Sequence, residues 1–185
     1  RVYGWKIVIH VFLAGLFFFL LLSRGFRVSP NVSFLGAALY MLNTEFISHT
    51  FPGHDGKMMV IAILPLIMWM LERLIEKATL WRAALFGASI GLSLLTSHIM
   101  MTYFVLWGLF AYAVFRVVFL FREQQKNRAI RLFLFFWIGI FFGLGVGMIQ
   151  LLPPYMYVNN GLSVRGPQMD FMHAASWSIH PEEAV

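Results

Sequence analysis

Long apolar runs separated by short polar segments dominate this sequence and constrain its fold. A helix needs about 20 mostly apolar residues to cross the hydrocarbon core of a membrane. Hydrophobic residues make up 60% of the chain and charged residues only 12%, whereas soluble domains carry roughly 25% charged residues. The sequence therefore predicts an integral membrane protein, folded as an all-α, polytopic transmembrane helix bundle.

We expect about six transmembrane spans. Residues 82–121 carry almost no charge, but one helix of that length would reach about 60 Å, twice the thickness of the hydrocarbon core. The polar cluster at residues 96–98 (TSH) stands alone within this stretch, so we place a break there. The predicted spans are residues 7–22, 32–48, 58–75, 83–95, 99–120 and 132–152.

These spans also predict how the chain is divided. We expect the transmembrane helical bundle to occupy residues 1–152 and residues 153–185 to begin an extracytoplasmic loop or domain. The chain opens with Arg1 rather than methionine and stops without a closing element, so we expect a fragment of a longer protein. A signal peptide is the competing interpretation of the first run, but residues 23–27 form no small-residue cleavage site and further spans follow.

Lysine and arginine are distributed unevenly between the two sides of the predicted bundle. One side would collect ten bases: Arg24, Arg27, Arg73, Lys77, Arg82, Arg116, Arg122, Lys126, Arg128 and Arg131. The other side would hold Arg1, Lys6, Lys57 and Arg165. Because cytoplasmic loops carry the excess of positive charge, the first side is predicted to be cytoplasmic. The net charge of +6 thus reports topology, and we expect no nucleic-acid partner.

Small residues recur at helix-packing spacing in two of the spans. Gly87 with Gly91, and Gly139 with Gly143 and Gly147, each follow the small-xxx-small pattern. This pattern lets two helix backbones approach closely inside a membrane. These glycines therefore predict helix packing and need no catalytic explanation.

Polar residues that could do chemistry gather on the predicted outer side. Residues 49–57 (HTFPGHDGK) contain two histidines, an aspartate and a lysine; Glu45 precedes them by one helical turn, and His98 lies in the break between two spans. Short connections usually join neighbours in space, so we expect the turn at His98 to lie beside the turn at His54. Inside a membrane such groups must pair, face water or bind a ligand, whereas a loop at the membrane surface tolerates them without any function.

Three kinds of chemistry could use this cluster. In group transfer involving a lipid phosphate, a base would neutralise the phosphate while a carboxylate or histidine handles the acceptor proton. A metal site could use His49, His54, Asp55 and His98 as ligands, although their spacing matches no helical zinc motif. A proton or solute path would place its charges at the membrane midplane, whereas these residues lie near the predicted surface.

Five short motifs occur in the order of a known family. They are residues 53–57 (GHDGK), 69–73 (WMLER), 91–98 (GLSLLTSH, with Tyr103 after it), 150–153 (QLLP) and 176–183 (SWSIHPEE). In this order they resemble the YfhO-type bacterial membrane proteins, which look like multi-span glycosyltransferases of the GT-C class. The likeness extends from about residue 34 to residue 183.

The resemblance implies sugar transfer at the extracytoplasmic face of the bacterial cytoplasmic membrane. The donor would be a polyprenyl-phosphate-linked sugar, the acceptor a cell-envelope polymer or lipid, and membrane lipid would surround the bundle. GT-C enzymes usually place a key acid in their first outer loop, a region that would lie upstream of Arg1. The resemblance therefore implies that the usual catalytic base of the GT-C class lies upstream of these residues.

The residues can be given roles within this expected site. Lys57 would hold the phosphate, with Arg165 as a second candidate and His49 beside the substrate. His54 and Asp55 would orient donor or acceptor, His98 would reach the same pocket, and Glu45 would supply a supporting carboxylate. No residue is assigned to a metal, and a divalent metal cofactor is left open.

Two other functions compete with sugar transfer. A transporter or flippase for a lipid-linked or small polar solute predicts charges at midplane depth and pseudo-symmetric halves, and the sequence shows neither. An inactive scaffold that anchors a partner enzyme would need no converging polar residues at all.

Overall fold

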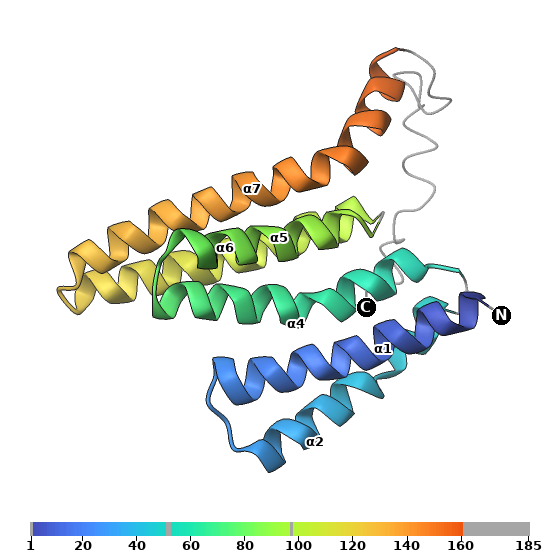
Figure 1. Ribbon diagram of the computed structural model, residues 1–185, viewed down its shortest axis with the longest axis horizontal. Helices are drawn as coiled ribbons and strands as arrows, with labels where there is room; N and C mark the ends of the chain where they lie inside the picture. Colours follow the sequence, from blue (N-terminus) through green and yellow to red (C-terminus); the bar gives the residue numbers. More distant parts are fainter. Residues whose placement is uncertain (1, 51–52, 97, 161–185) are drawn as a thin grey trace, which may run out of the picture. The chain divides into compact units, whose positions relative to one another are not determined.

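The computed structural model describes residues 2–50, 53–96 and 98–160 (Figure 1). They form helices without a β-strand among them: α1 (Val2–Leu20), the short π-helix η1 (Leu21–Gly25), α2 (Pro30–Met41), α3 (Thr44–Thr50), α4 (Asp55–Glu76), α5 (Leu80–Leu94), α6 (Ile99–Arg122) and α7 (Lys126–Asn159). The predicted all-α class is confirmed. The chain divides into two compact units, Arg1–Ile149 and Gln150–Val185.

Four of the described helical segments are long and apolar enough to cross a membrane. They are Gly4–Gly25, Asp55–Glu76, Ile99–Arg122 and Lys126–Asn159. Helix α5 is apolar but has 15 residues, and α2 has 12, so both are shorter than the roughly 20 residues that a full span needs. The break predicted at residues 96–98 falls where α5 ends and α6 begins.

The single segment predicted over residues 32–48 is wrong, because two helices occupy it. Helix α2 ends at Met41 and α3 begins at Thr44. Between them the side-chain Oδ1 of Asn43 accepts a hydrogen bond from the backbone N–H of Glu45 at 3.0 Å. Asparagine favours such capping positions over helix interiors, because its side chain competes with the backbone for hydrogen bonds.

The last helix extends past Pro153-Pro154, where the last membrane span was predicted to end. Helix α7 continues through both prolines to Asn159. Each proline removes one backbone donor, and its fixed φ is compatible with a helix, so the helical hydrogen bonds resume beyond the pair. The backbone N–H of Asn160 still donates to the carbonyl of Met156 at 3.0 Å.

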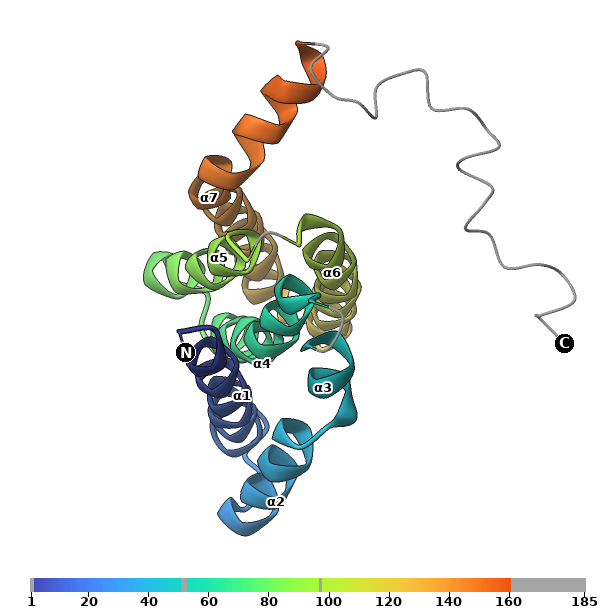
Figure 2. The same cartoon turned by 90° about the vertical axis from the view of Figure 1, so that its right-hand side faces the viewer.

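Helix α4 is the central helix of the first unit. It packs against α1, α3, α5 and α6 (Figure 2). In its most apolar 18-residue window 61% of the residues are buried, against 17% in the corresponding windows of Gly4–Gly25 and α6. The residues before and after α4 are therefore held by several neighbouring helices at once.

Helices α5 and α7 pack through the glycines that the sequence predicted for this purpose. A Cβ atom added to Gly87 would lie 2.3 Å from the carbonyl oxygen of Gly139, and one added to Gly143 would lie 2.7 Å from the carbonyl oxygen of Gly87. Gly147 lies in the same way against the side chain of Leu94. Only residues without a side chain allow this backbone approach, so the predicted packing role is confirmed.

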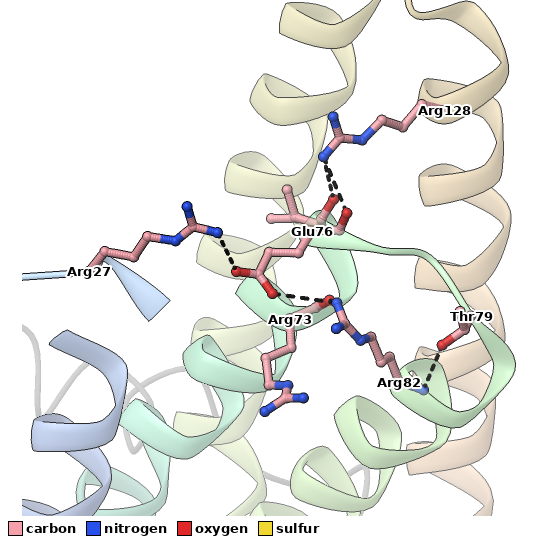
Figure 3. Close-up of polar contacts among 7 residues, drawn as sticks. Arg27, Arg73, Glu76, Thr79, Arg82 and Arg128 are labelled. Atoms are coloured by element: carbon pink, nitrogen blue, oxygen red, sulfur yellow. Dashed lines mark hydrogen bonds and ion pairs between the residues drawn. The ribbon is translucent and has the colours of Figure 1, made fainter. Parts of the chain in front are cut away.

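Arginines surround the last turn of α4, at what we call the basic end of the bundle (Figure 3). The Glu76 carboxylate pairs with Arg27 at 3.4 Å and with Arg82 at 3.5 Å. Arg128 donates to the carbonyls of Ile75 at 3.4 Å and Glu76 at 3.3 Å. Cations are favourable at a helix C-terminus, where carbonyls lack partners. Bases from the loop after η1, from α5 and from α7 thus meet at one end, as the predicted topology requires.

Candidate functional site

Four segments meet at the opposite end of α4, which we call the histidine end. Lys6 of α1 donates to the Asp55 carboxylate at 2.5 Å. The backbone N–H of His54 donates to the carbonyl of His49, at the end of α3, at 2.8 Å. A Cβ atom added to Gly56 would lie 3.0 Å from the Thr96 carbonyl oxygen and 3.5 Å from the Cβ of His98. The turn at His98 therefore lies beside the start of α4, as predicted.

Asp55 and Lys6 form the best-defined ion pair of this end. Their side chains are 28% and 40% exposed, so the pair lies at the rim of the bundle. Asp55 is also the acid in the first turn of α4, where the helix dipole favours a negative charge. Sequence reasoning gave Asp55 a role on substrate and overlooked Lys6 as its partner. The signal was present, because Lys6 is one of the few bases assigned to the outer side.

Lys57 is the third residue of the same helix. Its backbone N–H donates to the His54 carbonyl at 3.0 Å, and the residue is half-buried. Within the part of the chain that the structure describes, no carboxylate pairs with its ammonium group. The two lysines of this end therefore differ: Lys6 holds Asp55, whereas Lys57 has no anionic partner in the described residues.

His98 has a structural role at the start of α6. Its Nδ1 accepts the backbone N–H of Met101 at 3.3 Å, which caps the helix. A neutral imidazole that accepts through Nδ1 carries its proton on Nε2, so the ring presents an N–H donor. The buried hydroxyls of Ser93 and Thr102, 3.0 Å apart, join the ends of α5 and α6 at this turn.

Glu45 and His49 pair with each other one helical turn apart on α3. The distance from His49 Nε2 to Glu45 Oε1 is 3.4 Å, and the Glu45 side chain is 55% exposed. Between them Phe46 is buried in a cluster with Ala14, Met58 and Met59. This apolar contact holds α3 against α1 and α4, with Glu45 on the outer surface of α3 and the His49 side chain only 18% exposed.

One predicted site residue, Arg165, lies outside the described residues, and so does the motif at residues 176–183. Among residues 2–50, 53–96 and 98–160, no group of three histidine or acidic side chains is close enough to hold a metal ion. His49, His54, Asp55 and His98 therefore share one end of the bundle without forming a metal-binding cluster there.

The described residues are all-helical, four of their helical segments are long and apolar enough to cross a membrane, and histidines, acids and lysines gather at one end. Comparison of the chain with protein-family models, with curated proteins and with solved structures finds no match. The resemblance to the YfhO-type proteins and the GT-C class stays a prediction from the sequence motifs.

Proposed function

We propose that this chain is part of a GT-C-like membrane glycosyltransferase. It would transfer a sugar from a polyprenyl-phosphate-linked donor to a cell-envelope acceptor, at the histidine end of the bundle. In the predicted topology of about six spans, this end faces outward from the bacterial cytoplasmic membrane. The observation that carries the proposal is Lys57, a half-buried base with no anionic partner in the described residues, at the start of the central helix.

The start of α4 suits a phosphate because the helix dipole places partial positive charge there. The backbone amides of Lys57 and Met58 already donate to the His54 carbonyl, so the attraction comes from the charge of this helix end and not from free amides. Asp55 already supplies one negative charge at this terminus, but Lys6 neutralises it at 2.5 Å. Lys57 is then the base that remains to balance the charge of a donor phosphate.

The polyprenyl chain of the proposed donor would occupy an apolar cavity of about 430 Å³. Its walls come from η1 and from helices α1, α2, α4 and α6, and include Phe18, Leu64, Met68 and Leu109. Leu64 lies nine residues after Asp55 on α4, about 13 Å along the axis at the rise of an α-helix. A lipid with its phosphate at Lys57 would extend its apolar chain in the direction of this cavity.

The transfer needs a group that accepts a proton. The bond between the sugar C1 and the phosphate oxygen breaks, a bond from C1 to the acceptor oxygen forms, and the acceptor hydroxyl loses its proton. Polyprenyl phosphate leaves with its charge balanced by Lys57. His54 is exposed and makes no side-chain capping bond at the start of α4, so its imidazole is the candidate base among the described residues. His98 would donate through Nε2, with His49, Glu45 and Arg165 as supporting groups.

Transfer by purified protein in liposomes tests this proposal. With a panel of polyprenyl-phosphate sugars as donors, Lys57→Ala should lose about 2–4 kcal/mol of transition-state stabilisation, the cost of removing a charge-stabilising donor. Lys57→Arg should retain part of the activity, because it keeps the charge and changes the geometry. Lys77→Ala, at the opposite end of α4, is the matched control and should transfer normally. Near-normal transfer by Lys57→Ala, or movement of the donor across the membrane without transfer, would contradict the proposal.

A further inference from the structure

A groove with apolar walls and one charged end lies between α4 and α5, near the basic end of the bundle. The groove has a volume of about 390 Å³, and its walls include Leu66, Trp69 and Arg73 of α4 and Leu85, Ala88 and Leu92 of α5. Most of these side chains are apolar, and the charged group lies at one end. The proposed sugar transfer makes no use of this groove.

Two side chains that line this groove each carry a buried donor without an acceptor among the described residues. Among the described residues, the buried side-chain nitrogens without a hydrogen-bond partner are Trp69 Nε1 and Arg73 Nε. Buried polar atoms are nearly always satisfied, so such a pair calls for an explanation. Both belong to residues that line the same groove, and both are donors. The missing partner is therefore an acceptor of hydrogen bonds.

Arg73 also has no negative partner within the part of the chain that the structure describes, although an acid lies close by. In Figure 3 its side chain runs away from Glu76, whose carboxylate is taken by Arg27 and Arg82. The Arg73 guanidinium instead lies 5.9 Å from the centre of the Trp69 ring, a cation–π arrangement that leaves its charge uncompensated. An anionic acceptor would satisfy both the charge and the donors.

The order of groups along the groove matches the order of groups in a phospholipid. Arg73 lies three residues before the end of α4, Trp69 one turn deeper, and Leu66 deeper again. On α5, Leu85 lies nearest the basic end and Leu92 farthest from it. A guanidinium suits a phosphate, and an indole N–H suits the ester level, since tryptophan favours the membrane interface. The apolar residues beyond them suit an acyl chain.

We propose that this groove binds one anionic phospholipid, with its phosphate on the Arg73 guanidinium and an acyl chain between α4 and α5. Neighbouring bases at the basic end favour an anionic headgroup over a zwitterionic one. Arg24 is a further base close to the groove. The next residue, Gly25, lies so near Trp69 that an added Cβ would be 3.5 Å from the indole ring. The site is independent of the proposed transferase activity, and it would act on the stability and anchoring of the bundle.

Lipid binding to the purified protein, measured by native mass spectrometry, tests the charge. Both lipids present a phosphate to Arg73, but the choline ammonium cancels the headgroup charge of phosphatidylcholine, so phosphatidylglycerol should bind about tenfold more tightly beside these bases. Arg73→Gln should weaken binding of both lipids and largely remove this preference, whereas Arg73→Lys should retain part of the binding and part of the preference. Arg122→Gln removes an exposed base at the end of α6, so it is the matched control and should retain the preference. Equal effects of the two glutamine variants would mean that the lipid preference comes from the overall positive charge of the surface, and this result would overturn the proposal.

A second pair of variants tests the groove itself. Ala88→Phe fills the groove and should weaken binding of both lipids several-fold, whereas Ala111→Phe, on the exposed face of α6, should not. Glycerol 3-phosphate, which carries the phosphate without acyl chains, should fail to compete. Competition by glycerol 3-phosphate would point to a free-phosphate site. A change in oligomeric state of Arg73→Gln without any change in lipid binding would point to a second protein copy as the occupant, and either result would overturn the proposal.

Discussion

The hydroxyl of Tyr40 donates a hydrogen bond to the backbone carbonyl of Ile61 at 2.8 Å. In a regular helix that carbonyl would accept the N–H four residues later, but this residue is Pro65, which has none. A side chain of α2 thus satisfies the acceptor that the proline exposes in the central helix. The Tyr40 ring is held in place by stacking on Phe18, with ring centres 4.5 Å apart.

This relationship predicts that the cost of losing the Tyr40 hydroxyl depends on Pro65. Tyr40→Phe should lower the free energy of unfolding by about 1 kcal/mol, because it leaves the Ile61 carbonyl without a donor. In the Pro65→Ala background an alanine N–H can reach that carbonyl, so the same change should cost clearly less. Unfolding of the four proteins in mixed detergent micelles measures the coupling.

Tyr103→Phe is the control for this cycle. Tyr103 lies on an exposed face of α6 with 53% of its surface accessible, so the loss of its hydroxyl should change stability little. Equal costs of Tyr40→Phe with and without Pro65 would show that the hydroxyl does not serve the carbonyl freed by the proline.

The glycines between α5 and α7 give a second prediction. Gly87→Ala should lower the free energy of unfolding by at least the 1–3 kcal/mol typical of overpacking, because its Cβ would lie 2.3 Å from a backbone oxygen that cannot rotate away. Gly145→Ala is the matched control on α7, since no atom lies within 4 Å of its added Cβ. Unfolding in mixed micelles compares them. Similar stability of the two variants would mean that the helices do not pack through these glycines.

Some features of the fold could be read from the sequence because they follow from length and residue size. A stretch longer than a membrane is thick must break, and residues 96–98 offered the polar place to do so. Glycines spaced four apart predicted the close contact of α5 and α7. The proximity of His98 to the start of α4 followed from short connections between helices.

Other features depend on contacts that a single sequence does not specify. The polarity of Asn43 was noticed, but whether it caps a new helix or faces a neighbour depends on tertiary packing. The two prolines of α7 were expected to end the helix, but the helix continues through them. Proline is tolerated inside membrane helices where other groups satisfy the freed backbone carbonyls. The Lys6–Asp55 pair joins residues 49 positions apart, and charge alone could not choose Lys6 over Lys57 as the partner.

The predicted topology can be tested with introduced cysteines, since the chain has none. Ser48→Cys, on the exposed surface of α3 at the histidine end, should react with a membrane-impermeant thiol reagent in intact cells. Gln125→Cys, in the turn before α7 at the basic end, should react only after the membrane is permeabilised. The reverse pattern would invert the orientation and remove the histidine end from the outer face.

The Lys6–Asp55 pair predicts how the two residues act in the proposed transfer. The carboxylate is engaged at 2.5 Å by a side chain from another helix, so it should act together with Lys6 and not as an independent group. Lys6→Ala would leave a negative charge beside the donor phosphate and should raise the donor KM. Asp55→Asn would release Lys6 from its position and should also impair transfer, while the double variant should be no worse than the poorer single one.

Steady-state kinetics of the four proteins decides whether the pair acts as a unit. Residues that act together show strongly non-additive effects, whereas independent groups would multiply their losses in the double variant. Folding should be little changed in all of them, since an ion pair this exposed contributes about 0.5 kcal/mol. Lys77→Ala serves again as the control for general loss of positive charge. Multiplicative losses, with Asp55→Asn far more damaging than Lys6→Ala, would instead assign the carboxylate a direct role on the substrate.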